Sequence, residues 1–162
     1  MGTGTHRGCE FKSSPSPCSI DTSTKDVLGQ ISVGCRMAVK SMNQIMEHVE
    51  HAKLLKLINK FKMRHEELES DANDLLRKAG ETPPELPAAG SAFSWISAEM
   101  KLTWNDNVHE AAKLLMDGCN MGIQSLSESL NDFPSASSVS KELASQVISL
   151  EEEFLQELKA YL

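Results

Sequence analysis

Apolar residues recur at alternating steps of three and four along most of this chain, and this repeat constrains the fold more than any other feature. Such spacing places side chains on one stripe of an α-helix, whereas a strand exposed on one face needs alternation at every second residue. The repeat predicts an all-α protein with four amphipathic helices. Their stripes are Leu28, Ile31, Cys35, Ala38, Met42, Ile45 and Val49; Leu54, Ile58, Phe61, His65, Leu68, Ala72 and Leu75; Val108, Ala112, Leu115, Cys119, Gly122 and Leu126; and Leu143, Val147, Leu150, Phe154, Leu158 and Tyr161.

Interruptions of the repeat indicate where the first two helices begin and end. We expect the first helix to start near Thr24, because "DTSTKD" supplies side chains that can cap a first turn. The step of five from Val49 to Leu54 breaks the phase and predicts a turn around "HVEHAK". Gly80 is the residue type that most easily takes the left-handed conformation closing a helix, so the second helix should end there.

The second half of the chain begins with a long connection. "GETPPELPAAGS" is too rich in proline and glycine for regular structure, and "AFSWISAEMKLTW" at residues 92–104 has the spacing of a short amphipathic helix. Asn107 with Glu110 resembles a capping box and predicts the start of the third helix, while "NDFPSASS" predicts the turn into the fourth. Residues 1–23 lack periodicity and predict a disordered or non-native tail, which leaves 24–162 as one bundle domain.

The unequal connections favour one bundle topology over another. Helices of about 25 residues are about 40 Å long, and the two short turns predict two antiparallel hairpins. The middle connection is long enough to travel the length of the bundle, so the third helix could run parallel to the second, as in ferritin-like bundles. An up-down-up-down bundle with residues 92–104 folded over one end is the alternative.

Composition and charge exclude several classes of function. A formal net charge of -7 disfavours nucleic-acid binding, and no apolar run reaches the length of about 18 residues needed to cross a bilayer. The first residues lack the apolar stretch of a secretory signal, and His6 breaks the myristoylation pattern, so we expect a cytoplasmic protein. The 4 cysteines show no C-x-x-C spacing, and we expect Cys35 and Cys119 to be buried free thiols.

Three segments carry a family resemblance. "AFSWISAEMKLTW", "LLMDGCNMGIQSL" and "EEEFLQELKAYL" resemble segments of uncharacterised bacterial ferritin-like four-helix-bundle proteins, which are distantly rubrerythrin-like. The resemblance covers about residues 25–162 and depends mostly on packing positions. It implies the ferritin-like fold, whose members include iron oxidases, peroxide reductases, stress proteins and proteins without a metal.

The ligands of a ferritin-like two-metal centre are not recognisable here. Such a centre uses Glu-x-x-His on two helices, because i, i+3 spacing directs a carboxylate and an imidazole to one inner face, and the sequence contains no Glu-x-x-His. We therefore predict no cofactor. Only His65 has the phase to enter the core, where a histidine more often has a structural role, and Glu69, His109, Glu110 and Glu151 to Glu153 are interpreted as solvated or capping groups.

Two weaker metal hypotheses remain open. His48 and His51 are spaced i, i+3 in a segment with Glu47 and Glu50, which permits a surface site at the end of the bundle. The alternative function is a metal-binding or redox-stress ferritin-like protein that holds iron, manganese or zinc through His65, Glu69 and acids of the fourth helix. No nucleophile motif or phosphate-binding loop indicates another catalytic site.

Both tryptophans of the chain lie in residues 92–104. Packing across the bundle accounts for one face of this segment, but Trp95 and Leu102 fall off that face, so with Trp104 they are the candidate partner interface. A second copy of the chain or another protein could cover them, whereas the segment lacks the basic face that an anionic membrane selects. The sequence thus predicts a non-enzymatic bundle that acts through self-association or a protein partner.

Overall fold

The computed structural model describes residues 19–86 and 107–162, and these residues form four long helices and no strand. The helices are α1 (Thr22–Met46), α2 (Ala52–Lys78), α4 (Asn107–Asp132) and α5 (Ser138–Leu158), followed by the short 3-10 helix η1 (Lys159–Tyr161). The prediction of an all-α bundle is confirmed for this part of the chain. None of these helices combines the length and hydrophobicity required to cross a bilayer.

Side-chain caps set the starts of three helices, and in α2 this cap is His51. Asp21 accepts a hydrogen bond from the Thr24 amide at 2.7 Å, so α1 begins two residues earlier than the sequence predicted. Ser137 caps α5 in the same way, through the Ser140 amide. At the other end of α2, Gly80 has a φ of 78°, as expected of a residue that closes a helix.

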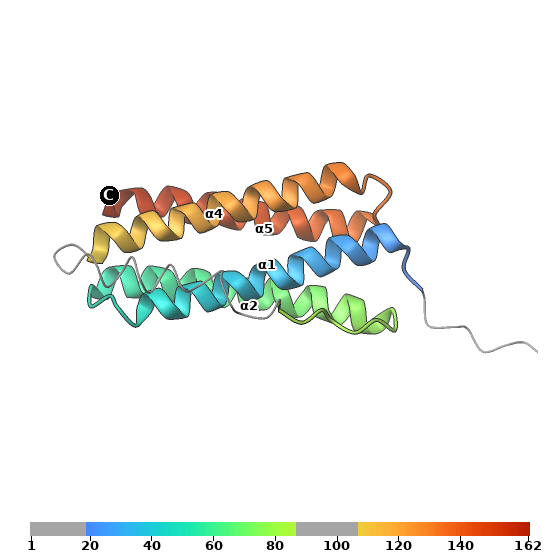
Figure 1. The fold of residues 1–162 in the computed structure, drawn as a ribbon, viewed down its shortest axis with the longest axis horizontal. Coiled ribbons are helices and arrows are strands. Elements are labelled where there is room, and N and C mark those ends of the chain that lie inside the picture. Colours follow the sequence, from blue (N-terminus) through green and yellow to red (C-terminus); the bar gives the residue numbers. More distant parts are fainter. Residues whose placement is uncertain (1–18, 87–106) are drawn as a thin grey trace, which may run out of the picture.

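The helices form two antiparallel hairpins, α1–α2 and α4–α5, stacked as two layers (Figure 1). The start of α1 lies beside the α4–α5 loop, because Ser137 donates its amide hydrogen to Thr24 Oγ1 at 2.8 Å. At the opposite end, the turn between α1 and α2 lies beside the C-terminus, where the rings of His51 and Tyr161 meet edge to face. Consequently α2 and α4 are parallel, and the chain between them connects opposite ends of the bundle.

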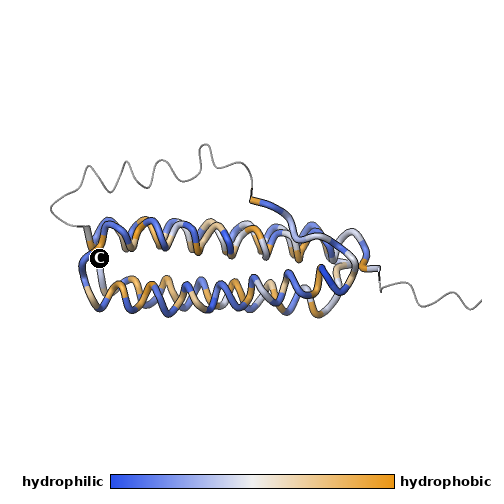
Figure 2. The backbone as a smooth tube through the Cα atoms, turned by 90° about the horizontal axis from the view of Figure 1, so that it is seen from below, coloured by the Kyte–Doolittle hydropathy of each residue, from blue (hydrophilic) through white to orange (hydrophobic). Residues whose placement is uncertain are grey.

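The hydrophobic core consists of two clusters, one toward each end of the bundle. Hydrophobic residues recur along all four helices with hydrophilic residues between them (Figure 2). The turn-end cluster, near the α1–α2 turn, includes the stacked rings of Phe61 and Phe154, 4.4 Å apart. The loop-end cluster, near the α4–α5 loop, contains aliphatic residues such as Leu28, Leu76 and Leu143, and its fully buried members include no aromatic ring. Most residues of the four predicted stripes are buried, but Ala38, Leu68, Leu75, Val108, Gly122 and Tyr161 are half-buried, and Leu76 is buried in place of Leu75.

The segment after α2 turns back along α1. Lys25 forms an ion pair with Glu81 at 2.7 Å, and Pro84 lies against Gly29. This direction leads from the loop end of the bundle toward the turn end, where α4 begins. Residues 87–106 lie outside the described part, and with them the predicted short helix at 92–104 and the candidate interface residues Trp95, Leu102 and Trp104.

Candidate functional site

The most distinctive side chain of the interior is His65, in the middle of α2. It has no exposed surface, as its helical phase predicted. Its Nδ1 lies 2.8 Å from the backbone carbonyl oxygen of Phe61, one turn earlier in the same helix, and its Nε2 lies 2.9 Å from Oε1 of Glu151 in α5. Both ring nitrogens are therefore engaged by groups of the protein itself.

Glu151 is buried too, and this corrects the prediction that Glu151, Glu152 and Glu153 all face solvent. Glu151 is 5% exposed, whereas Glu152 and Glu153 are exposed. The carboxylate fits inside the bundle because α4 presents Gly122 there: a Cβ atom at that position would lie 3.1 Å from Glu151 Oε1. The absence of a side chain at Gly122 thus makes room for the Glu151 side chain.

The hydrogen-bond roles of this pair follow from its acceptors. The Phe61 carbonyl can only accept, so Nδ1 of His65 carries a hydrogen and donates it. At Nε2, either an imidazolium donates to the Glu151 carboxylate or a carboxylic acid donates to the ring. In both forms no nitrogen lone pair of His65 remains for a metal ion, and every hydrogen-bonding atom of the ring is satisfied, as buried polar groups require.

Two buried thiols flank this pair, Cys119 in the turn-end cluster and Cys35 in the loop-end cluster. Burial raises the pKa of Cys119 well above the usual range, and the Glu151 carboxylate raises it further through its charge and through hydrogen bonding. Burial also raises the pKa of Cys35, with smaller contributions from the charges of Glu151 and Glu69. Both cysteines are free, and as protonated thiols they are poor nucleophiles. The polar layer, defined as Cys35, His65, Cys119 and Glu151, receives one residue from each long helix.

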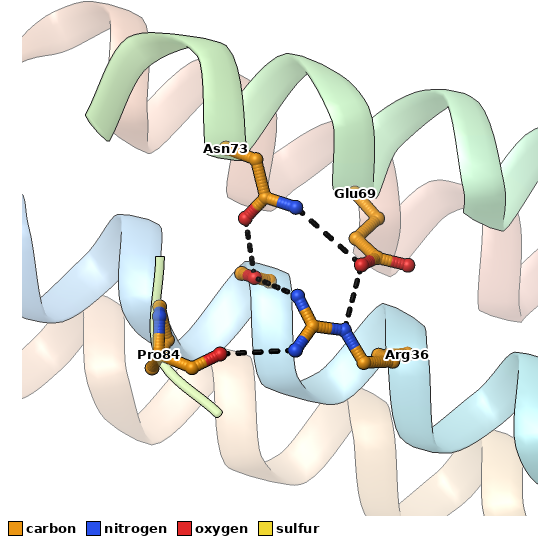
Figure 3. Close-up of polar contacts among 5 residues, drawn as sticks. Arg36, Glu69, Asn73 and Pro84 are labelled. Carbon is orange, nitrogen blue, oxygen red and sulfur yellow. Dashed lines mark hydrogen bonds and ion pairs between the residues drawn. The ribbon is translucent and has the colours of Figure 1, made fainter. Parts of the chain in front are cut away.

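A second polar network lies at the contact between α1 and α2 (Figure 3). The Arg36 guanidinium donates from Nε to Glu69 Oε1 at 2.7 Å and from Nη1 to the Pro84 carbonyl at 3.0 Å. The buried Ser32 hydroxyl donates to Asn73 Oδ1 at 2.6 Å, and Asn73 in turn contacts Glu69 at 3.4 Å. We call this network the brace and define it as Ser32, Arg36, Glu69, Asn73 and Pro84. The brace fixes the segment after α2 against α1.

The structure separates the residues that were predicted as metal ligands. Glu69 is paired with Arg36 in the brace rather than with His65. His51 is exposed at the N-terminus of α2, where its Nδ1 accepts the Leu54 amide at 3.2 Å. His48 is half-buried and lies just after α1. Because residues 48 and 51 flank a turn, the one-face argument for an i, i+3 helical pair does not apply to them.

No group of three or more His, Cys, Asp or Glu side chains within residues 19–86 and 107–162 is arranged to hold a metal ion. A scan of protein-family models, a search of curated proteins and a search of solved structures each found no match to this chain.

Glu151 was missed in the sequence, although a signal for it exists. It lies four residues after Val147 and three before Phe154, which is a position on the apolar stripe of α5. The run of three glutamates at 151–153 suggested a solvated face and obscured this spacing. The pair could have been predicted from two observations together: Glu151 occupies a position on the apolar stripe of one helix, and His65 occupies a position on the apolar stripe of another.

Proposed function

We propose that this protein is a non-enzymatic, ferritin-like helical bundle that acts by self-association or by binding a protein partner, without a family-type diiron centre. Two features support the ferritin-like part of the proposal. One is the parallel arrangement of α2 and α4 (Figure 1), which requires a connection along the whole bundle. The other is the resemblance of three sequence segments to ferritin-like proteins. A cytoplasmic location stays a prediction from the sequence.

The observation that carries the proposal is the state of the polar layer. Both ring nitrogens of His65 are hydrogen-bonded, one to Phe61 and one to Glu151, and the two thiols are buried with raised pKa values. These are the properties of side chains that satisfy one another inside a core. A catalytic or metal site needs at least one such group to face a substrate or an open coordination position.

Residues 92–104 are the sequence's best candidate for the interface. Trp95, Leu102 and Trp104 are large apolar side chains of the type that dominates binding energy in protein interfaces. We expect the full chain to be a dimer or larger in sedimentation equilibrium, and Trp95→Ser to weaken the association. Met63→Ser is the matched control, because Met63 is an exposed apolar residue of α2. A monomer for both the native chain and Trp95→Ser would refute self-association and leave binding of another protein.

The alternative of a metal-binding or redox-stress protein is favoured by one observation, the convergence of an imidazole, a carboxylate and thiols in the polar layer. Elemental analysis of the purified full chain separates the two functions. We expect no stoichiometric iron, manganese or zinc. A stoichiometric metal that is retained by the native chain and lost from His65→Gln, with the helical content of both unchanged, would overturn the non-metal proposal.

A further inference from the structure

A groove runs along the surface between α2 and α5. It is made of two hollows of about 500 and 330 Å³, which share Asp71, Glu142 and Gln146 and are therefore continuous. All the residues that line it come from these two helices. From Arg64 to Lys78 of α2 it extends about 21 Å at 1.5 Å per residue, the length of about four helical turns.

The side chains of α5 explain why the groove exists. α2 packs far less closely on α5 than on α1. Ser145 and Ser149, four residues apart, face the groove from α5 and are too small to fill it. Leucines from both helices contribute to its lining, including the half-buried Leu68 and Leu75 of α2. The groove thus combines an apolar base with room for additional side chains.

Five acidic residues and two basic residues, Arg64 and Lys78, line the groove, and three of the acids have no ion-pair partner in the described part of the bundle. Glu67, Asp71 and Glu142 line it, are exposed, and form no ion pair with any residue that the structure describes. Toward the turn end the lining carboxylate is paired, because Arg64 forms an ion pair with Glu153 at 2.7 Å. The middle of the groove therefore offers three free carboxylates around apolar side chains.

We propose that this groove binds a cationic amphipathic α-helix of a partner protein. Leucine-like side chains of the partner would enter the hollows, and lysine or arginine side chains beside them would pair with Glu67, Asp71 and Glu142. The length of the groove fits about four turns of such a helix. A second copy of this chain is a poor occupant through the same face, because its own carboxylates would oppose these three.

The inference deepens the proposed function by naming one class of partner, and it rests on that function being protein binding. Its test is independent of self-association. Oligomeric mass is measured on the protein alone, whereas groove binding is measured by titration with a peptide at a fixed protein concentration. A monomeric protein that binds the peptide supports the groove, and a dimeric protein that ignores it refutes the groove alone.

The probe is a dye-labelled peptide of about 18 residues, made only of leucine and lysine, with leucines at helical spacings of three and four. Binding to the full chain is followed by fluorescence anisotropy. We expect saturable binding that weakens when NaCl is raised from about 50 to about 300 mM, because ionic screening acts on exposed charges. A peptide of the same composition with a scrambled order should bind at least about tenfold more weakly, since it cannot present an apolar stripe.

Matched variants locate the binding. Replacing Glu67, Asp71 and Glu142 together by glutamine or asparagine should weaken binding by about tenfold or more. The control replaces Glu66, Asp117 and Glu152, three exposed acids that do not line the groove, so it changes net charge by the same amount. We expect the control to change affinity by less than about twofold. Equal losses in the two variants, or no loss in either, would overturn the proposal.

Carbodiimide cross-linking, which joins lysines directly to carboxylates, tests the occupant. We expect the peptide to cross-link to Glu67, Asp71 or Glu142. Cross-links from Lys12 of the protein alone to these acids would assign the groove to the chain's own N-terminal segment. A change of oligomeric mass in the groove variant, but not in its control, would assign it to a second copy. Either of these results would overturn the partner helix.

Discussion

The polar layer and the brace place the same kind of pair in two different surroundings. In each, a basic side chain meets a glutamate from another helix at a similar distance, 2.9 Å for His65–Glu151 and 2.7 Å for Arg36–Glu69. The His65 and Glu151 side chains are 0% and 6% exposed, whereas those of Arg36 and Glu69 are 29% and 18% exposed. Water can replace a lost partner in the brace, but it has little access to the polar layer.

This difference in access predicts how the two networks respond to change. Removing one member of a buried pair leaves a polar group without a partner, which costs more than the pair itself contributes. Removing one member of a partly exposed pair costs little beyond the lost contact. The brace therefore contributes local order, whereas the loss of a single partner in the polar layer should destabilise the whole interior.

The largest expected effect is that of Glu151→Ala. It should lower the free energy of unfolding by about 3–5 kcal/mol, because His65 stays buried without its partner. Urea denaturation followed by circular dichroism measures it. Glu152→Ala, the exposed neighbour, should stay within about 0.5 kcal/mol of the native chain.

Replacing both members of the pair sharpens this result. His65→Leu combined with Glu151→Leu should recover most of the lost stability, since the two partners are removed together. The comparison between the two networks fails if Glu151→Ala costs no more than Glu152→Ala.

The thiols of the polar layer predict the next largest effect, a loss of stability in alkali. Burial raises the pKa of Cys35 and Cys119, so above about pH 9 the unfolded chain releases protons that the folded chain retains. Stability should then fall with rising pH by up to about 1.4 kcal/mol per pH unit for each thiol, with no such effect below the usual thiol pKa. Urea midpoints between pH 8 and 10 test this, and Cys35→Ala with Cys119→Ala should flatten the slope. An unchanged slope would contradict the burial of both thiols.

Arg36→Ala should have a smaller effect, of about 1–2 kcal/mol, because it removes hydrogen bonds that are partly exposed. Its more specific result should be faster hydrogen exchange at the Glu81 amide, which donates to the Leu76 carbonyl, because Arg36 holds the following residues through the Pro84 carbonyl. Arg77→Ala is the control, since Arg77 pairs with Asp74 within one helix and on the surface. Equal exchange in both variants would show that the brace does not hold this segment.

The smallest effect compares two glycines of α4. Gly118→Ala should stabilise the protein by about 0.5–1 kcal/mol, because a Cβ there meets open space and alanine favours a helix. Gly122→Ala should gain less or lose stability, since its Cβ would crowd Glu151 Oε1 at 3.1 Å. Unfolding free energies of the two variants give the difference directly, and equal gains would mean that the carboxylate moves aside without cost.

Much of the fold could be predicted from the sequence because apolar periodicity records which side of each helix is buried. The phase of His65, the turn around residues 48–51 and the closing role of Gly80 all follow from single-chain geometry. The connections also predicted two hairpins, since short turns leave little choice of direction.

The site was less predictable because it depends on which helices are neighbours in the bundle and on their register along the bundle axis. Nothing near Arg36 in the sequence indicates that it meets Glu69, 33 residues away, or a carbonyl of the following segment. Ser32 and Asn73 were overlooked for the same reason: a polar residue in a stripe becomes interpretable only when its partner is known. The candidate interface at Trp95, Leu102 and Trp104 lies outside the described residues and stays a prediction.

The position of the polar layer between two hydrophobic clusters has a consequence for the alignment of the helices. Apolar stripes alone tolerate a shift of one helix along another, because leucine and isoleucine side chains pack in several registers. If α5 moved along α2 by one turn, about 5.4 Å, Glu151 would face hydrocarbon and His65 Nε2 would lose its hydrogen-bond partner. The His65–Glu151 pair thus fixes the axial register of the α4–α5 hairpin on the α1–α2 hairpin.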